Sequence, residues 1–189
     1  VKKGKREQEI LSRYLEPSGE HSLAPTALFR YVECPLKFYM ASIAKLRTND
    51  ELSDTIDALT FGNILHESME ELYKPLLKLA NPNAEIERLA NRDTIAAAVD
   101  NTMCRLLMNS RKVSSEEFSG DMLLVRDIII KYIQRGIMRY DIANEGYTIA
   151  GLEKDVDWQC PISNGRMVNL SGRADRIDRR ADGALQIID

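Results

Sequence analysis

Cysteine is scarce in this sequence, and long apolar runs are missing. Cys34, Cys104 and Cys160 are odd in number and far apart, which argues against a disulfide framework and supplies no CxxC pair for a metal. No stretch approaches 18 uninterrupted apolar residues, so we expect no membrane span. The basic start at residues 1–6 has no apolar segment behind it, so no signal peptide is expected. We therefore expect a cytoplasmic protein with reduced thiols.

The chain also lacks a large excess of either basic or acidic residues. The 26 basic and 29 acidic residues give a net charge of -3, which excludes a chain that binds nucleic acid through its overall basicity. Any DNA site must then be local. Basic residues gather in two places, at the start of the chain and near its end: Lys2, Lys3, Lys5 and Arg6, then Arg166, Arg173, Arg176, Arg179 and Arg180.

The composition otherwise fits one globular domain, with 44% hydrophobic and 29% charged residues over 189 positions. Residues 1–21 are polar and contain Pro17, Ser18 and Gly19, which predicts a tail or linker. The domain itself is expected over residues 22–189.

Helical patterns dominate residues 22–145. Leu65, Met69, Leu72 and Leu76 recur at steps of three and four residues, the spacing of an amphipathic helix. The predicted helices are 22–46 with a break at Cys34 and Pro35, 61–79 with a kink at Pro75, 84–108, and 116–143 behind a capping box from Ser114 to Glu117.

Strand patterns replace them in residues 146–189. Three strands are expected, over 147–159, 167–177 and 184–189. The dipeptides Asn164-Gly165 and Asp182-Gly183 separate them and favour tight hairpin turns. The sequence therefore predicts a three-stranded antiparallel meander. Because the chain starts without Met and stops within an apolar run, we expect it to be part of a longer protein.

Two acids of the last hairpin are candidate metal ligands. Pairing of the last two strands would bring Asp175 and Asp189 near each other, and two close carboxylates repel unless a cation neutralises them. Oxygen ligands suit Mg²⁺ or Mn²⁺. The alternative is that Asp175 and Asp178 are solvated strand-edge acids paired with neighbouring arginines, and spacing alone leaves both interpretations open.

The hairpin resembles the catalytic hairpin of the RecB-like and AddB-like branch of the PD-(D/E)XK nuclease superfamily. That family has a Gly-x-x-Asp-Arg-Ile-Asp strand, matched by residues 172–178, and then a strand ending Ile-Asp-Tyr-Lys, matched by residues 187–189. Its catalytic lysine would fall two residues after Asp189. The resemblance implies a partial nuclease domain over 22–189, with an α/β (α+β) restriction-endonuclease-like core, a helical lobe over 22–145 and the antiparallel β-meander over 146–189.

A second segment, Phe61-Gly62-Asn63-Ile64-Leu65-His66, is similar to the family's Phe-Gly-x-x-x-His, whose histidine is a metal ligand. The resemblance thus implies His66, Asp175 and Asp189 as catalytic residues and as ligands of Mg²⁺ or Mn²⁺. A lone histidine on a helix is otherwise more often a packing or surface residue. Glu70 shares the face of His66 and is a possible outer-shell partner. Glu153 resembles an acid often found in the first strand, and either supports the site or faces water.

A third segment, residues 28–39 around Cys34-Pro35, is similar to the opening of these nuclease domains. In AddB-like members this cysteine is the first ligand of a 4Fe-4S cluster. Cys104 and Cys160 lack the clustered spacing that such a cluster needs. Cys34 is therefore either an iron-sulfur ligand completed elsewhere in a longer protein or a buried small residue.

Together these resemblances imply a metal-dependent DNA nuclease of the exonuclease type, part of a helicase-nuclease that repairs double-strand breaks. DNA and a helicase domain or subunit would be its partners. Arg173 and Arg176 would contact phosphates, which positions DNA without reading its sequence. The alternatives are a catalytically inactive nuclease-fold subunit that binds DNA or a partner, and a nuclease of the CRISPR or restriction type.

Overall fold

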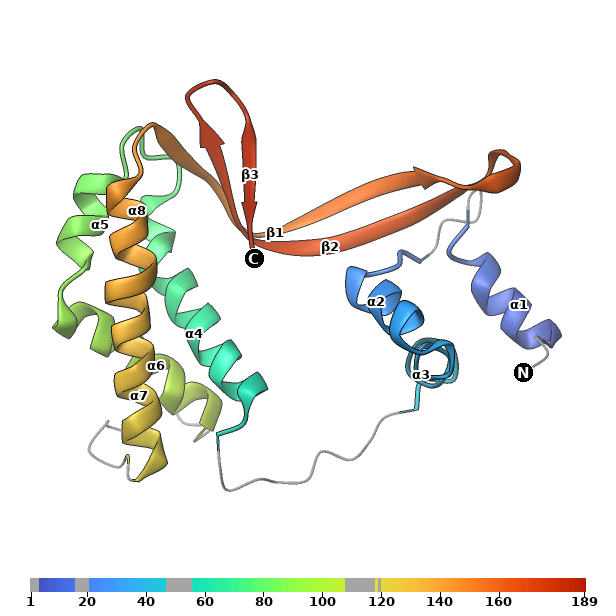
Figure 1. Ribbon diagram of the computed structural model, residues 1–189, viewed down its shortest axis with the longest axis horizontal. Coiled ribbons are helices and arrows are strands. Elements are labelled where there is room, and N and C mark those ends of the chain that lie inside the picture. Colours follow the sequence, from blue (N-terminus) through green and yellow to red (C-terminus); the bar gives the residue numbers. More distant parts are fainter. Residues whose placement is uncertain (1–3, 16–20, 47–55, 108–117, 119) are drawn as a thin grey trace. The chain divides into compact units, whose positions relative to one another are not determined.

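The computed structural model describes residues 4–15, 21–46, 56–107, 118 and 120–189, and Figure 1 shows their course. The chain forms two compact units. Unit 1 comprises Val1–Glu51 and Asp155–Arg173, and unit 2 comprises Leu52–Lys154 and Ala174–Asp189. Pro17–Gly19, from the predicted tail or linker, and the predicted Ser114–Glu117 capping box lie outside the described residues.

Unit 1 contains the interrupted helix that the sequence predicts. Its helices are α1 (Lys5–Ser12), α2 (Pro25–Glu33), α3 (Pro35–Phe38) and the π-helical turn η1 (Tyr39–Ile43). Cys34 separates α2 from α3 with an extended backbone, φ -159° and ψ 110°, because the residue before a proline avoids the helical region. The break at Cys34 and Pro35 is thus confirmed.

The helices of unit 2 are α4 (Ala58–Tyr73), the 3-10 turn η2 (Lys74–Leu76), α5 (Asn83–Leu89), α6 (Arg92–Leu107), α7 (Asp121–Lys131), the π-helical stretch η4 (Tyr132–Met138) and α8 (Arg139–Ala143). Figure 1 shows α7 and α8 continuing one another, coloured yellow to orange. No helix among the described residues is long and apolar enough to cross a membrane.

Three predicted helix boundaries were wrong, and a cap or a proline explains each. The helix expected over 61–79 begins earlier, because the side chain of Asp57 accepts a hydrogen bond from the Thr60 amide at 2.7 Å. It ends at Tyr73 rather than kinking, since Pro75 lies in the 3-10 turn. The helix expected over 84–108 divides into α5 and α6, where Asn91 Oδ1 accepts from the Thr94 amide at 2.8 Å.

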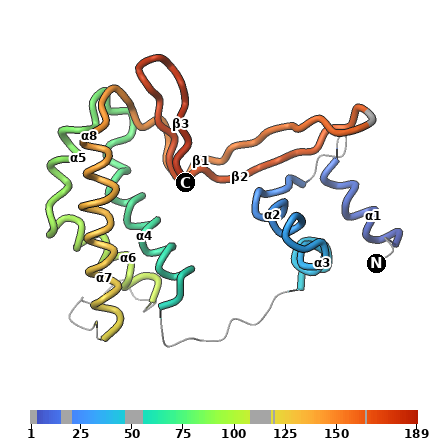
Figure 2. Tube along the Cα trace, in the orientation of Figure 1, coloured from blue at the N-terminus to red at the C-terminus, as the bar shows by residue number. Residues whose placement is uncertain are grey.

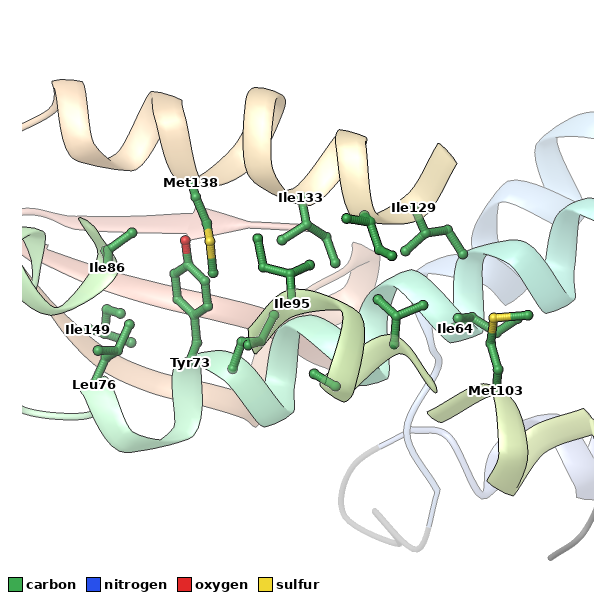
Figure 3. Close-up of a cluster of buried hydrophobic side chains, with 14 of the residues drawn as sticks. Ile64, Tyr73, Leu76, Ile86, Ile95, Met103, Ile129, Ile133, Met138 and Ile149 are labelled. Atoms are coloured by element: carbon green, nitrogen blue, oxygen red, sulfur yellow. The ribbon is translucent and has the colours of Figure 1, made fainter. Parts of the chain in front are cut away.

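The core of unit 2 lies where α4 packs on α6 and α6 packs on α7. Figure 3 shows apolar side chains from these elements meeting, with those of α5 and β1 beside them. The side chains with at most 1% exposure include Ile64, Tyr73, Leu76, Ile86, Ile95, Met103, Ile129, Ile133, Met138 and Ile149. This core fixes the position of α4, the helix that carries His66.

The three strands are β1 (Tyr147–Pro161), β2 (Met167–Arg180) and β3 (Leu185–Ile188), hydrogen-bonded in the order β1-β2-β3 (Figure 2). β2 and β3 are antiparallel, with Arg176 opposite Ile188 and Arg179 opposite Leu185. Gly183 takes φ +85° in their turn, a conformation that glycine adopts without strain. The predicted meander is confirmed, and the helices with this sheet give the expected α+β, restriction-endonuclease-like class.

Candidate metal centre

Three side chains of unit 2 converge from three different elements. His66 lies on α4, Glu153 on β1 and Asp175 on β2. His66 Nε2 is 2.5 Å from Glu153 Oε1, and His66 Nδ1 is 3.0 Å from Asp175 Oδ2. One ligand atom from each residue lies within 4.8 Å of the other two. Within the described part of the chain, this is the one group of histidine, cysteine or acidic residues with such spacing.

Helix and strand geometry place two of these residues. Ile64 and Ser68 on α4 are fully buried. His66 lies two residues from each and therefore points to the opposite side of the helix, with its side chain 31% exposed. On β2, side chains alternate between two faces. Asp175 lies between buried Ala174 and buried Arg176 and keeps 38% of its side chain exposed. Both residues are thus held by a packed backbone while their polar atoms reach the surface.

Glu153 is placed by a distorted backbone. Its φ is +48° inside β1, a left-handed conformation that costs a residue other than glycine about 1–2 kcal/mol. In a regular strand, Leu152 and Glu153 would point to opposite faces, yet both line the same cavity. The local break in the strand therefore turns the Glu153 carboxylate toward His66, as bulges beside functional sites do.

The cavity at the three residues has a volume of about 410 Å³. Apolar side chains form part of its wall and carboxylates another part. Asp189 lines it as well, and one step beyond the Arg176–Ile188 pair the register brings Asp189 opposite Asp175. The full lining is Gly62, Leu65, His66, Met69, Glu70, Tyr73, Tyr132, Ile137, Leu152, Glu153, Asp175, Arg176, Ile188 and Asp189.

The three expected ligands, His66, Asp175 and Asp189, therefore line one cavity. The three side chains that lie closest together are a different set. His66 and Asp175 contact each other directly. Glu153, which the sequence marked as a possible supporting acid, is the third member of the group in place of Asp189. Glu70, the other such acid, lines the cavity without belonging to the group.

The donor set suits a divalent cation. A neutral imidazole has one N–H, so it can donate to one of two flanking carboxylates only. Both ring nitrogens of His66 nevertheless face a carboxylate oxygen. A cation among these three groups would neutralise the carboxylates and use one ring nitrogen as a ligand. Carboxylate oxygens with one imidazole fit Mg²⁺ or Mn²⁺ better than metals that prefer sulfur.

Arg176 lies in the interior of unit 2, away from the solvent where a phosphate contact was expected. The residue is 7% exposed, and Nη1 donates to Asp141 Oδ2 at 2.6 Å. Nη2 and Nε donate to the two carboxylate oxygens of Asp178 at 2.6 and 2.8 Å. Burial alone would lower the pKa of Arg176, but the hydrogen bonds to Asp178 and Asp141 raise it well above its ordinary value. A phosphate would have to displace two buried carboxylates to reach this guanidinium.

The same contacts correct the interpretation of Asp178 as a solvated strand-edge acid. Asp178 is 4% exposed, and its partner is a buried arginine. Asp141 is 35 residues from Arg176 in the sequence. A helical pattern does not tell which acid will contact a strand, so sequence reasoning missed Asp141. An acid among the apolar positions of a predicted helix is the one feature that could have indicated it.

The remaining candidates lie in unit 1. Arg173 keeps 60% of its side chain exposed and pairs with Asp155 at 3.2 Å. Cys34 is a partly buried free thiol between α2 and α3. Among the described residues no metal-binding group includes Cys34.

Comparison with known proteins identifies the family of the chain. No curated protein matches the chain. The family model of the PD-(D/E)XK nuclease superfamily matches residues 22–189, a range that includes His66, Glu153 and Asp175. Members of this superfamily are mostly nucleases that use divalent metals. The match covers most of the sequence, and the chain therefore belongs to the PD-(D/E)XK nuclease superfamily.

Proposed function

We propose that this chain forms the metal-binding part of a DNA nuclease, with His66, Glu153 and Asp175 as ligands of one Mg²⁺ or Mn²⁺. The observation that carries the proposal is the convergence of an imidazole and two carboxylates, with ligand atoms within 4.8 Å, from three separate elements. Asp189 lines the same cavity and is a further ligand or a group that orients water. A decayed site has no chemical reason to keep these residues together, which favours a nuclease over an inactive binding subunit.

The bound cation would polarise a phosphodiester and make an attacking water more acidic. The protein's own residues prepare the site for this. Whichever nitrogen of His66 binds the cation, the other remains beside a carboxylate that accepts its N–H, which fixes the tautomer and the ring orientation. Leu65, Met69 and Leu152 in the cavity wall limit the access of water from their side, so the charged groups interact more strongly.

For contact with DNA we retain Arg173 and withdraw Arg176 as a direct phosphate ligand. Arg173 is exposed, and Asp155, one of its partners, is 74% exposed, so a phosphate can compete with this carboxylate for the guanidinium at little cost. Arg176 has no such freedom because its carboxylate partners are buried.

The finer assignment rests on sequence resemblance. Residues 172–178 and the segment around Cys34 favour the RecB-like and AddB-like branch, and hence an exonuclease that works with a helicase domain or subunit in double-strand-break repair. On the same basis we propose residues 22–189 as the nuclease domain, and Cys34 as a candidate ligand of a 4Fe-4S cluster in the full-length protein.

The test is DNA degradation by the full-length product of the gene that encodes this chain. Linear DNA labelled at either end is incubated with Mg²⁺, with Mn²⁺ or with a chelator. We expect metal-dependent cleavage that Asp175→Asn abolishes and that Glu145→Gln, an exposed acid of the same unit, leaves intact. DNA binding without cleavage in the wild type would instead favour the inactive binding subunit.

A further inference from the structure

Unit 2 contains a buried charge cluster, formed by Tyr73, Asp141, Arg176 and Asp178, whose members are hydrogen-bonded to one another. Besides its bonds to Arg176, Asp141 Oδ2 accepts a hydrogen bond from the Tyr73 hydroxyl at 2.6 Å. Asp141 Oδ1 accepts from Arg176 Nη2 at 3.0 Å. The guanidinium carbon also lies 5.1 Å from the ring centre of Tyr73 and 5.4 Å from that of Tyr147. Such ring contacts stabilise a desolvated cation, so every charged group of the cluster has partners.

The cluster joins the elements that carry the candidate metal ligands. Tyr73 lies on α4, two helical turns after His66 and on the same face of that helix. Arg176 follows Asp175 on β2. Tyr73 and Arg176 also line the cavity of the metal site. Asp141 on α8 contacts both Tyr73 and Arg176 and thus links α4 to β2 next to the cavity.

Stability alone does not explain such a cluster. Desolvation of two carboxylates and a guanidinium offsets most of their attraction, and well-packed apolar residues of similar volume are often as stabilising or more so. What distinguishes the guanidinium is its directionality, because its N–H groups donate paired hydrogen bonds to planar carboxylates in a fixed geometry. The charged groups therefore fix the spacing between α4, α8 and β2 more strictly than apolar packing would.

We propose that the buried charge cluster is a positioning device, which holds α4 and β2 at the separation where His66 and Asp175 share one cation. None of its members is proposed as a metal ligand, so Tyr73, Asp141, Arg176 and Asp178 are positioning residues. The inference rests on the metal site of the proposed function.

The test replaces the whole cluster with apolar residues so that no buried polar atom loses its partner. Mn²⁺ binding to the 189-residue chain is measured by calorimetry in the absence of DNA, beside thermal unfolding. The matched control removes another Arg–Asp pair of unit 2, the pair that joins α6 to α7 and does not line the cavity. The variants are Tyr73→Phe/Asp141→Leu/Arg176→Met/Asp178→Leu and, as control, Asp100→Leu/Arg126→Met.

We expect the apolar cluster variant to unfold at or above the wild-type temperature and yet to bind Mn²⁺ about 10- to 100-fold more weakly, the range seen when supporting partners of metal ligands are changed. The control should bind Mn²⁺ as the wild type does. Tyr73→Phe alone, which removes one hydroxyl, should show a smaller loss of affinity in the same direction.

Unchanged Mn²⁺ affinity in a folded cluster variant would overturn the inference but would not contradict the proposed metal site. If the cluster variant does not fold, Tyr73→Phe decides, and unchanged affinity there has the same meaning. If the wild type binds no Mn²⁺, or His66→Ala binds it equally well, the metal site itself fails and this inference fails with it.

Discussion

Removal of the guanidinium alone tests whether Arg176 is buried and paired as the structure has it. Arg176→Met keeps a long apolar stem but leaves Asp141 and Asp178 beside each other in the interior, at 2% and 4% exposure, without a cation. Loss of one partner from a buried ion pair costs about 3–5 kcal/mol. Two carboxylates lose their partner here, so we expect about 5 kcal/mol, against a total stability of about 5–15 kcal/mol for a domain of this size.

The assay is urea unfolding at pH 7, followed by far-ultraviolet circular dichroism. Arg88→Met is the matched control, since Arg88 is exposed and pairs with Glu85 on the surface of α5. It should unfold at the same urea concentration as the wild type. A loss of less than about 1 kcal/mol in Arg176→Met, the value of a surface pair, would show that Arg176 is not a buried partner of both acids.

Three further predictions concern the strained residue, the buried phenols and the core. Glu153→Gly relieves about 1–2 kcal/mol of left-handed strain and loses about 0.5–1 kcal/mol through backbone entropy, so urea unfolding should show stability near that of the wild type while Mn²⁺ affinity falls; a large loss of stability would contradict the strain. Burial and the Asp141 carboxylate raise the pKa of Tyr147 to about 12 and that of Tyr73 well above its ordinary value. The stability from the protonated phenol of Tyr147 is therefore complete below pH 10 and lost as the pH rises through 12; absorbance titration that shows every tyrosine ionising near pH 10 in the folded chain would oppose this. Ile133→Ala, at a site with no exposure, should lower the free energy of unfolding by about 2–5 kcal/mol, whereas Leu124→Ala, at 60% exposure, should stay within about 0.5 kcal/mol of the wild type.

Much of the fold could be predicted from local signals. The dipeptide Asp182-Gly183 and the alternating strands around it specified the β2–β3 hairpin, because the turn requires a residue that tolerates positive φ. The break at Cys34 followed from the proline after it. The boundary at Asn91 was missed because apolar residues continue on both sides of it, and the decisive signal is a side-chain cap on the Thr94 amide.

The site was predictable only in part, for a physical reason. Motif spacing brought His66 and Asp175 to one place, and the structure has them in contact. The position of Glu153 depends on a left-handed backbone angle that a strand pattern does not reveal. The burial of Arg176 depends on Asp141, and which distant acid meets a strand is set by tertiary packing. Sequence pattern thus indicated which types of side chain form the candidate site, whereas packing decided which of them lie closest together.

In the proposed function, His66, Glu153 and Asp175 together bind one divalent cation. The most direct measurement is Mn²⁺ titration of the chain by calorimetry and electron paramagnetic resonance, in the wild type and in His66→Ala, Glu153→Gln, Asp175→Asn and the control Glu145→Gln. We expect one strong site in the wild type and the control, and a marked loss of affinity in each of the three other variants. Equal binding in the wild type and in the three variants would contradict it.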